Sequence, residues 1–84
     1  MVTEKADPDD PGHVAAPFQG VAAATVQVGD EVQAGDAVAM IEGMKMESSS
    51  TTPVTGVVRR IVVPTPRSVE ARDLILVVEN TTAR

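Results

Sequence analysis

The chain has 84 residues, of which 43% are hydrophobic, and it carries a net charge of −5 with one aromatic residue and no cysteine. A chain this short forms one small domain with a thin core, which argues against an enzyme with its own pocket. Its acidic, aromatic-poor composition is unsuited to nucleic acid, and without cysteine there are no disulfides, thiolate metal sites or catalytic thiols. No stretch approaches the roughly 20 apolar residues of a membrane span, so we expect a soluble, cytoplasmic module with no membrane or nucleic-acid partner.

Residues 1–12 are rich in charge and proline. Pro8 and Pro11 stand among five charged residues, and almost no side chain in this stretch could pack in a core. We therefore expect residues 1–12 to be a flexible acidic linker or tail, residues 13–79 to form the folded domain, and residues 80–84 to be a C-terminal tail.

From residue 13 onward, short runs of valine and alanine alternate with glycine and proline. This pattern is typical of short strands joined by tight turns, and no helical period is present. The predicted strands cover residues 13–16, 20–26, 31–33, 37–42, 46–51, 56–62, a short segment near Val69, and 74–79. The sequence therefore predicts an all-β fold.

The chain contains an internal repeat. Residues 17–21 (PFQGV) match residues 53–57 (PVTGV) at an offset of 36, and residues 32–42 match residues 69–79 at an offset of 37. Two copies of a four-strand unit predict a flattened barrel or sandwich of two four-stranded antiparallel sheets, related by a pseudo-two-fold axis.

The segment between the two copies, EGMKME at residues 42–47, is the candidate functional site. A strand ending at Glu42 and another beginning at Met46 leave a tight turn with Lys45 at its tip, and loop tips on rigid sheets display binding groups. Lys45 is the one lysine of the predicted domain. Methionines ordinarily fill cores, and a turn lysine is ordinarily a solvated charge, so the pattern alone leaves a structural and a functional interpretation open.

The segment EGMKME resembles the attachment motif of the biotinyl domain, the biotin carboxyl carrier module of biotin-dependent carboxylases. Residues 28–38 (VGDEVQAGDAV) resemble that family's upstream glycine-aspartate strands. Residues 13–20 (HVAAPFQG), together with the acidic linker, are most similar to the C-terminal carrier segment of bacterial pyruvate carboxylases. A Met-Lys-Met triplet at a hairpin tip inside a matching repeat is a specific signal, whereas the triplet alone is not.

The resemblance implies that biotin is attached covalently to Lys45 by a biotin protein ligase. The hairpin residues implied in ligase recognition are Glu42, Gly43, Met44, Met46 and Glu47. Biotin on Lys45 would shuttle CO2 from a biotin carboxylase site to a carboxyltransferase site, with pyruvate or an acyl-CoA as the acceptor. The chemistry then belongs to the cofactor and to these partner domains or subunits, and the chain itself is a non-catalytic carrier.

Two other functions stay open. A lipoyl domain shares the implied fold but usually carries Asp-Lys-Ala around its lysine, and an unmodified or degenerate barrel-type interaction module would lack the acceptor lysine. Three features depart from the family pattern: Gly43 replaces the usual alanine, Arg72 stands where the first half has Gly35, and serines occupy positions 48–50. We expect Gly43 to loosen the hairpin, since glycine costs roughly 0.5–1 kcal/mol relative to alanine.

The remaining polar residues are assigned structural roles. His13 has no nucleophile or second metal ligand near it in the sequence, and Asp30, Asp36 and Asp73 are predicted turn residues that bond to their own backbone, so no metal site is expected. Ser50 is expected to face the core, because alternate residues of a half-buried strand point inward. A buried serine places a hydroxyl that needs a hydrogen-bond partner where an apolar side chain would pack. The strand that follows Lys45 is therefore expected to have low local stability.

Overall fold

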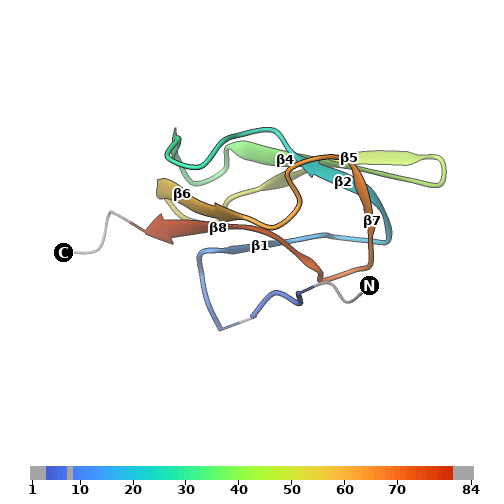
Figure 1. Cartoon of the computed structure of the whole chain (residues 1–84), viewed down its shortest axis with the longest axis horizontal. Helices are drawn as coiled ribbons and strands as arrows, with labels where there is room; N and C mark the ends of the chain where they lie inside the picture. Colours follow the sequence, from blue (N-terminus) through green and yellow to red (C-terminus); the bar gives the residue numbers. More distant parts are fainter. Residues whose placement is uncertain (1–3, 8, 81–84) are drawn as a thin grey trace.

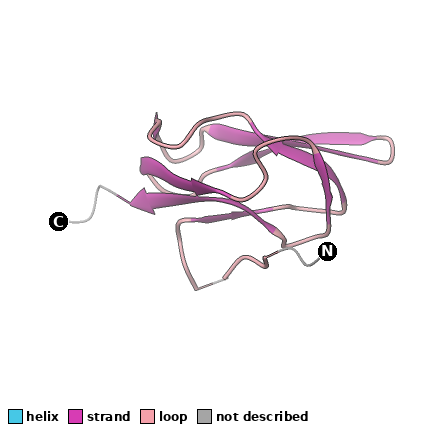
Figure 2. Ribbon diagram, viewed as in Figure 1, coloured by secondary structure: helices cyan, strands magenta, loops and turns pink. Residues whose placement is uncertain are grey.

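The computed structural model describes residues 4–7 and 9–80, which form strands and turns with no helix among them (Figure 2). The eight strands are β1 (His13–Ala15), β2 (Gly20–Ala24), β3 (Glu31–Val32), β4 (Ala37–Gly43), β5 (Met46–Thr51), β6 (Gly56–Ile61), β7 (Arg67–Val69) and β8 (Leu74–Asn80). Their ends lie within two residues of those expected. The predicted strand at residues 20–26 runs two residues past β2, which ends at Ala24, although the Thr25 amide still donates to the Val38 carbonyl of β4.

The strands form two four-stranded antiparallel sheets, in the orders β1-β8-β6-β3 and β5-β4-β2-β7 (Figure 1). The two orders correspond strand by strand: β1, β8, β6 and β3 of the first sheet take the places of β5, β4, β2 and β7 in the second. The flattened barrel and its pseudo-two-fold repeat are thus confirmed, and β4 is equivalent to β8.

The core lies between the two sheets and consists mainly of β-branched and leucine side chains. In β4, Val38 and Ile41 are buried while Met40 and Glu42 face outward, and Val58 and Leu76 close the core from the other sheet. Fully burying one such side chain contributes about 1.5–3 kcal/mol relative to leaving it in water. The repeated Pro-x-x-Gly motif also has a packing role: a Cβ at Gly20 or Gly56 would overlap the carbonyl oxygen of Glu42 or Glu79.

The turns before β4 and β8 share one geometry. The Oδ2 atom of Asp36 accepts from the Gln33 amide at 2.9 Å, and that of Asp73 accepts from the Glu70 amide at 2.8 Å. Gly35 has a φ of 95°, and Arg72, at the equivalent position, has a φ of 73°. The turn roles of both aspartates are confirmed, as is that of Asp30, whose carboxylate accepts from the Gln27 amide.

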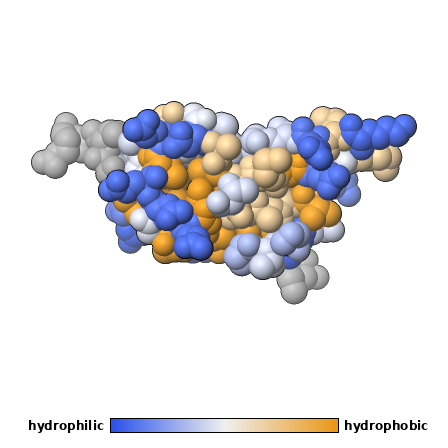
Figure 3. All heavy atoms as spheres, turned by 90° about the horizontal axis from the view of Figure 1, so that it is seen from above, coloured by the Kyte–Doolittle hydropathy of each residue, from blue (hydrophilic) through white to orange (hydrophobic). Residues whose placement is uncertain are grey.

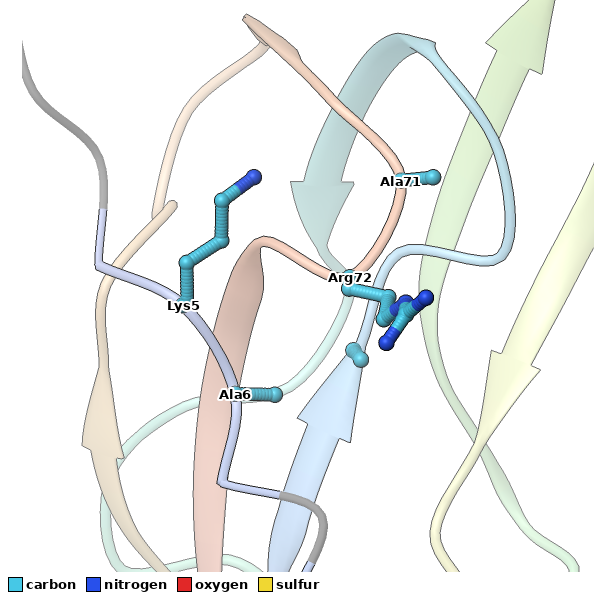
Figure 4. A pocket seen from close by; sticks show the side chains of 5 residues that line it. Lys5, Ala6, Ala71 and Arg72 are labelled. Carbon is cyan, nitrogen blue, oxygen red and sulfur yellow. The ribbon is translucent and has the colours of Figure 1, made fainter.

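Residues 4–7 lie against the barrel. The Ala6 amide donates to the Arg72 carbonyl at 2.9 Å, and the Lys5 Nζ lies 2.6 Å from Oδ1 of Asp73, whose side chain is 1% exposed. Glu4 and Arg60 form a bidentate pair with distances of 2.7 and 3.0 Å. The hydrogen bond from Arg60 lowers the pKa of Glu4, and the hydrogen bond to Asp73 raises the pKa of Lys5. Lys5, Ala6, Ala71 and Arg72 border a shallow hollow here (Figure 4).

Residues 4–7 and 9–12 belong to the segment expected to be a linker, and several of them contact the barrel. The side chains of Glu4 and Lys5 pair with it, and the Gly12 carbonyl accepts from the Val78 amide of β8 at 2.8 Å. His13 also has a structural role, because its Nδ1 accepts from the Asp7 amide and its Nε2 lies 3.2 Å from the Asp10 carboxylate. The remaining residues of the predicted linker and tail, 1–3, 8 and 81–84, lie outside the described part of the chain.

Candidate functional site

The β4–β5 hairpin places Lys45 at the tip of a two-residue turn. Gly43 of β4 pairs with Met46 of β5, so Met44 and Lys45 make the turn. Lys45 has a φ of 65° and Met44 does not have a positive φ, which is the sign pattern of a type II turn. A left-handed backbone costs an L-residue about 1–2 kcal/mol, and tight hairpins usually place glycine or asparagine there. Lysine at this position therefore does not serve the stability of the turn.

The hairpin extends beyond the other strands at one end of the molecule, whose principal dimensions are 41 × 21 × 18 Å (Figure 1). Lys45 is exposed, and so are the methionines on either side of it, Met44 at 89% and Met46 at 55%. Within residues 4–7 and 9–80, the Lys45 amine has no hydrogen bond or ion pair. The geometry thus presents a primary amine and two apolar side chains to a partner molecule.

Two carboxylates stand at the base of the hairpin. Glu42 and Glu47 are directly opposite each other across β4 and β5, and both are exposed. Like charges in such a pair are destabilising, by roughly 0.2–1 kcal/mol. No ion pair joins either glutamate to Lys45 or to any other described residue. Within the described chain, the hairpin therefore carries an unpaired amine at its tip and, where it joins the barrel, two carboxylates that no positive charge neutralises.

Gly43, at the end of β4, is half-buried beneath the ring of Phe18. A Cβ at Gly43 would lie 2.9 Å from Cε1 and 3.1 Å from Cδ1 of Phe18, closer than ordinary carbon contacts. Phe18, from the β1–β2 connection, also packs against the core. The sequence places Phe18 in the repeat and in the segment that resembles the family, but no role at the hairpin was expected for Phe18. The repeat held the missed signal, because the equivalents of Phe18 and Gly43 are Val54 and Asn80.

The expected inward orientation of Ser50 is confirmed. Its side chain is 6% exposed, it stands opposite Ala39 of β4, and its Oγ atom has no hydrogen-bond partner within the described chain. The neighbouring Ser49 faces outward, where its hydroxyl donates to the Met40 sulfur at 3.2 Å. Strand β5 thus buries little apolar surface immediately after the turn that carries Lys45.

The outer face of the β5-β4-β2-β7 sheet carries an apolar groove beside the hairpin. Val21 and Met40, 45% and 44% exposed, line it together with Pro66, and Glu42 and Glu47 border it. Figure 3 shows hydrophobic side chains over the middle of this face and hydrophilic ones toward its ends. Sequence reasoning missed this surface because valine and methionine in a strand normally indicate core.

Residues 4–7 and 9–80 contain no group of three or more histidine, aspartate or glutamate side chains arranged to hold a metal ion. No segment within this part of the chain is a helix long and apolar enough to cross a membrane.

A family model, Biotin_lipoyl, described as biotin-requiring enzyme, matches residues 10–78. The chain is 33% identical over 82 residues to pyruvate carboxylase from Staphylococcus aureus, and 37% identical over 76 residues to mitochondrial pyruvate carboxylase from Mus musculus. These matches cover 96% and 89% of this chain but only 7% and 6% of the two relatives. The apo structure of the ectoine utilization protein EutE (DoeB) from Ruegeria pomeroyi matches with a TM-score of 0.67 at 21% identity, covering 89% of this chain and 24% of that one, which shows a shared fold.

Proposed function

This chain belongs to the Biotin_lipoyl family as a biotinyl domain, and on that premise we propose that biotin is attached to Lys45 through an amide bond. The observation that carries the proposal is the exposed Lys45 amine at the tip of a strained two-residue turn, between Met44 and Met46. A lysine without an ion pair is available to a second protein, whereas Lys5 is paired with Asp73. The hairpin thus fits the group that the family name implies.

Attachment requires only a nucleophile from this chain. A biotin protein ligase would supply the biotinyl-adenylate, and the neutral ε-amine of Lys45 would attack its carboxyl carbon. A C–N bond forms, the bond between that carbon and the phosphate oxygen breaks, AMP leaves, and the amine proton passes to the ligase or to water. We assign Glu42, Gly43, Met44, Met46 and Glu47 to ligase recognition. Met44 and Met46 are exposed at the tip, Glu42 and Glu47 are exposed carboxylates at the base of the hairpin, and the half-buried Gly43 joins the two.

Once loaded, the domain is proposed to act as a carboxyl carrier without catalysing a reaction itself. Bound biotin supplies a ring nitrogen that takes up and releases a carboxyl group. The protein contributes a rigid barrel that holds this group away from its own surface, so that it can enter a biotin carboxylase site and then a carboxyltransferase site. The two relatives compared above are named pyruvate carboxylases, which makes pyruvate the acceptor we favour over an acyl-CoA.

A lipoyl group is the alternative cofactor. The family model carries both names, and the exposed lysine would accept either group. The methionines on both sides of Lys45 favour biotin, because lipoyl hairpins usually carry Asp-Lys-Ala. Incubating the chain with a biotin protein ligase or with a lipoate-protein ligase separates the two. We expect a gain of about 226 Da with the first and no gain with the second, where lipoylation would add about 188 Da.

Carboxyl transfer tests the carrier role. The biotinylated chain is mixed with the biotin carboxylase part of a bacterial pyruvate carboxylase, ATP and radiolabelled bicarbonate. We expect protein-bound label that pyruvate discharges once the carboxyltransferase part is added. The Lys45→Arg variant, carried through the same loading step, is the control and should take up no label. A fully biotinylated chain that stays unlabelled would contradict the carrier role.

A further inference from the structure

The two halves of the repeat exchange a large and a small residue beside the acceptor hairpin. Phe18 and Gly43 in one half correspond to Val54 and Asn80 in the other. Gly20 and Gly56 show that the backbones superpose here, because a Cβ at either would lie 3.1 Å from the Cα of Gly43 or Asn80. The two halves therefore share one backbone here and differ in the size of these side chains. The half that carries Lys45 is the one with Phe18 and Gly43.

The location of the exchange matters for the hairpin. Strand β2 begins at Gly20, and its register pairs Val21 with Glu42, so β2 gives β4 no ladder partner beyond Gly43. The turn residues project past this point with only β5 beside them. The Phe18 ring, packed on Gly43 and on the core, extends the support for the hairpin past the end of β2.

We propose that Phe18 is a positioning residue for the modification of Lys45, acting through Gly43. This inference rests on the proposed function. The ring fixes the base of the hairpin, and glycine suits position 43 because a methyl group there would lie 2.9 Å from the ring and 3.1 Å from the Gln19 carbonyl oxygen. Gly43 then tightens the hairpin through Phe18, rather than loosening it through backbone freedom alone.

A looser hairpin spends less time in the conformation that the ligase binds. Because apparent affinity falls in proportion to the competent fraction, variants of this pair should raise the KM of the ligase for the chain and leave kcat at saturation unchanged. Loss of global stability, by contrast, leaves KM unchanged as long as the chain stays folded at the assay temperature.

The test is a double-mutant cycle on Phe18 and Gly43, read by ligase kinetics and by amide exchange of residues 43–47. Phe18→Val and Gly43→Ala should each raise KM about fivefold or more. The double variant should have a lower KM than Gly43→Ala, because valine removes the ring contacts of the methyl group and leaves only the Gln19 carbonyl oxygen, 3.1 Å from it. Amide exchange in the hairpin should follow the same order. Val54→Ala, a truncation at the equivalent position of the other half, is the matched control and should leave KM unchanged.

Additive effects in the cycle, or a Val54→Ala variant with the same rise in KM, would overturn the proposal. Phe18→Leu replaces Phe18→Val if the latter is unfolded at the assay temperature, as judged by circular dichroism. If the ligase does not modify the wild type at all, the proposed function fails, and amide exchange still decides whether Phe18 and Gly43 are coupled. Exchange that is insensitive to both substitutions would then overturn the positioning role as well.

Discussion

The two halves of the barrel follow the same path but differ in how well they are packed. Their strands, their turn aspartates and their Pro-x-x-Gly motifs superpose. Among the equivalent positions at which they differ, four pairs change the backbone strain or the packing: Val14 and Ser50, Gly35 and Arg72, Phe18 and Val54, and Gly43 and Asn80. At three of these pairs, the residue in or beside the β4–β5 hairpin is unusual for its position: Ser50 is polar, Phe18 is large and Gly43 is small. Backbone requirements keep the halves alike, and three of these four differences lie in or beside the candidate site.

The pair Val14 and Ser50 shows the difference most directly. Both side chains are buried, 3% and 6% exposed, on equivalent edge strands. Val14 buries two methyl groups, whereas Ser50 buries a hydroxyl that has no partner in the described structure. The strand that follows Lys45 is therefore the less stable of the two edges.

Making the better-packed edge resemble the weaker one should have the largest effect. Val14→Ser removes two buried methyl groups and adds a hydroxyl without a partner, so we expect the free energy of unfolding to fall by about 2–3 kcal/mol. Urea denaturation measures this change. A loss below about 0.5 kcal/mol would mean that the edge strands tolerate polarity equally and that the halves do not differ in packing.

The reciprocal change should improve the weaker edge. Ser50→Val restores buried methyl groups, so we expect a gain of about 1–2 kcal/mol, which corresponds to a rise in Tm of several degrees for a domain of this size. Amide exchange across β5 should slow, whereas in the wild type it should be faster than across β6. Ser49→Val, on the outward face of the same strand, is the control. A lower Tm for Ser50→Val would show that the site has no room for the methyl groups.

Much of the fold could be predicted because its determinants are local or repeated. Valine-rich runs bounded by glycine and proline placed every strand within two residues, and the repeat required two equivalent sheets. The hairpin tip could be predicted equally well, because Lys45 stands between the two copies of the repeat. Even the inward orientation of Ser50 follows from strand alternation alone.

Arg72 and Gly35 offer a smaller contrast between the halves. Both have a positive φ, 73° and 95°, and nothing within 4 Å would obstruct a Cβ at Gly35. The left-handed conformation is unfavourable for arginine, so Arg72→Gly should stabilise the chain by about 1 kcal/mol and Gly35→Arg should destabilise it by a similar amount. Thermal unfolding of the two variants measures both. A loss of stability in Arg72→Gly would mean that contacts of the arginine side chain outweigh the backbone strain.

The smallest expected effect concerns the N-terminal segment, which covers one of two equivalent turn aspartates. Asp73, beneath the segment, is 1% exposed, whereas Asp36, in the other half, is exposed. Arg60 lowers the pKa of Glu4, so the stabilisation from their pair is present at neutral pH and lost as pH falls through that lowered pKa. Asp73 raises the pKa of Lys5, so the stabilisation from that pair is lost as pH rises through the raised pKa.

We therefore expect Glu4→Gln to lower the Tm at pH 7, and to differ less from the wild type at an acid pH below the lowered pKa of Glu4, where its carboxylate is protonated. The Ala6 amide, which donates to Arg72, reports docking of the segment by NMR. Asp36→Asn, at the equivalent turn without a covering segment, is the control and should leave the Ala6 amide unchanged. A Tm difference between Glu4→Gln and the wild type that is equal at both pH values would contradict this account.

Docking of the N-terminal segment and the Phe18–Gly43 contact could not be predicted, for a shared physical reason. Each depends on contacts between residues far apart in the sequence, and the residue types do not identify their partners. Charged residues at positions 4–10 have the composition of a solvated tail, and only the buried Asp73 shows why Lys5 lies on the barrel. A lone phenylalanine likewise indicates a core, without indicating which glycine it covers.

The central claim is that one lysine at the divergent end of the repeat accepts the cofactor. The chain holds two lysines, so the direct test is biotinylation of the wild type, Lys5→Arg and Lys45→Arg by a biotin protein ligase, followed by streptavidin binding and peptide mass mapping. Arginine keeps the charge but has no amine that can be acylated. We predict full modification of the wild type and of Lys5→Arg, with biotin on Lys45, and none of Lys45→Arg. Streptavidin binding by Lys45→Arg would contradict the assignment.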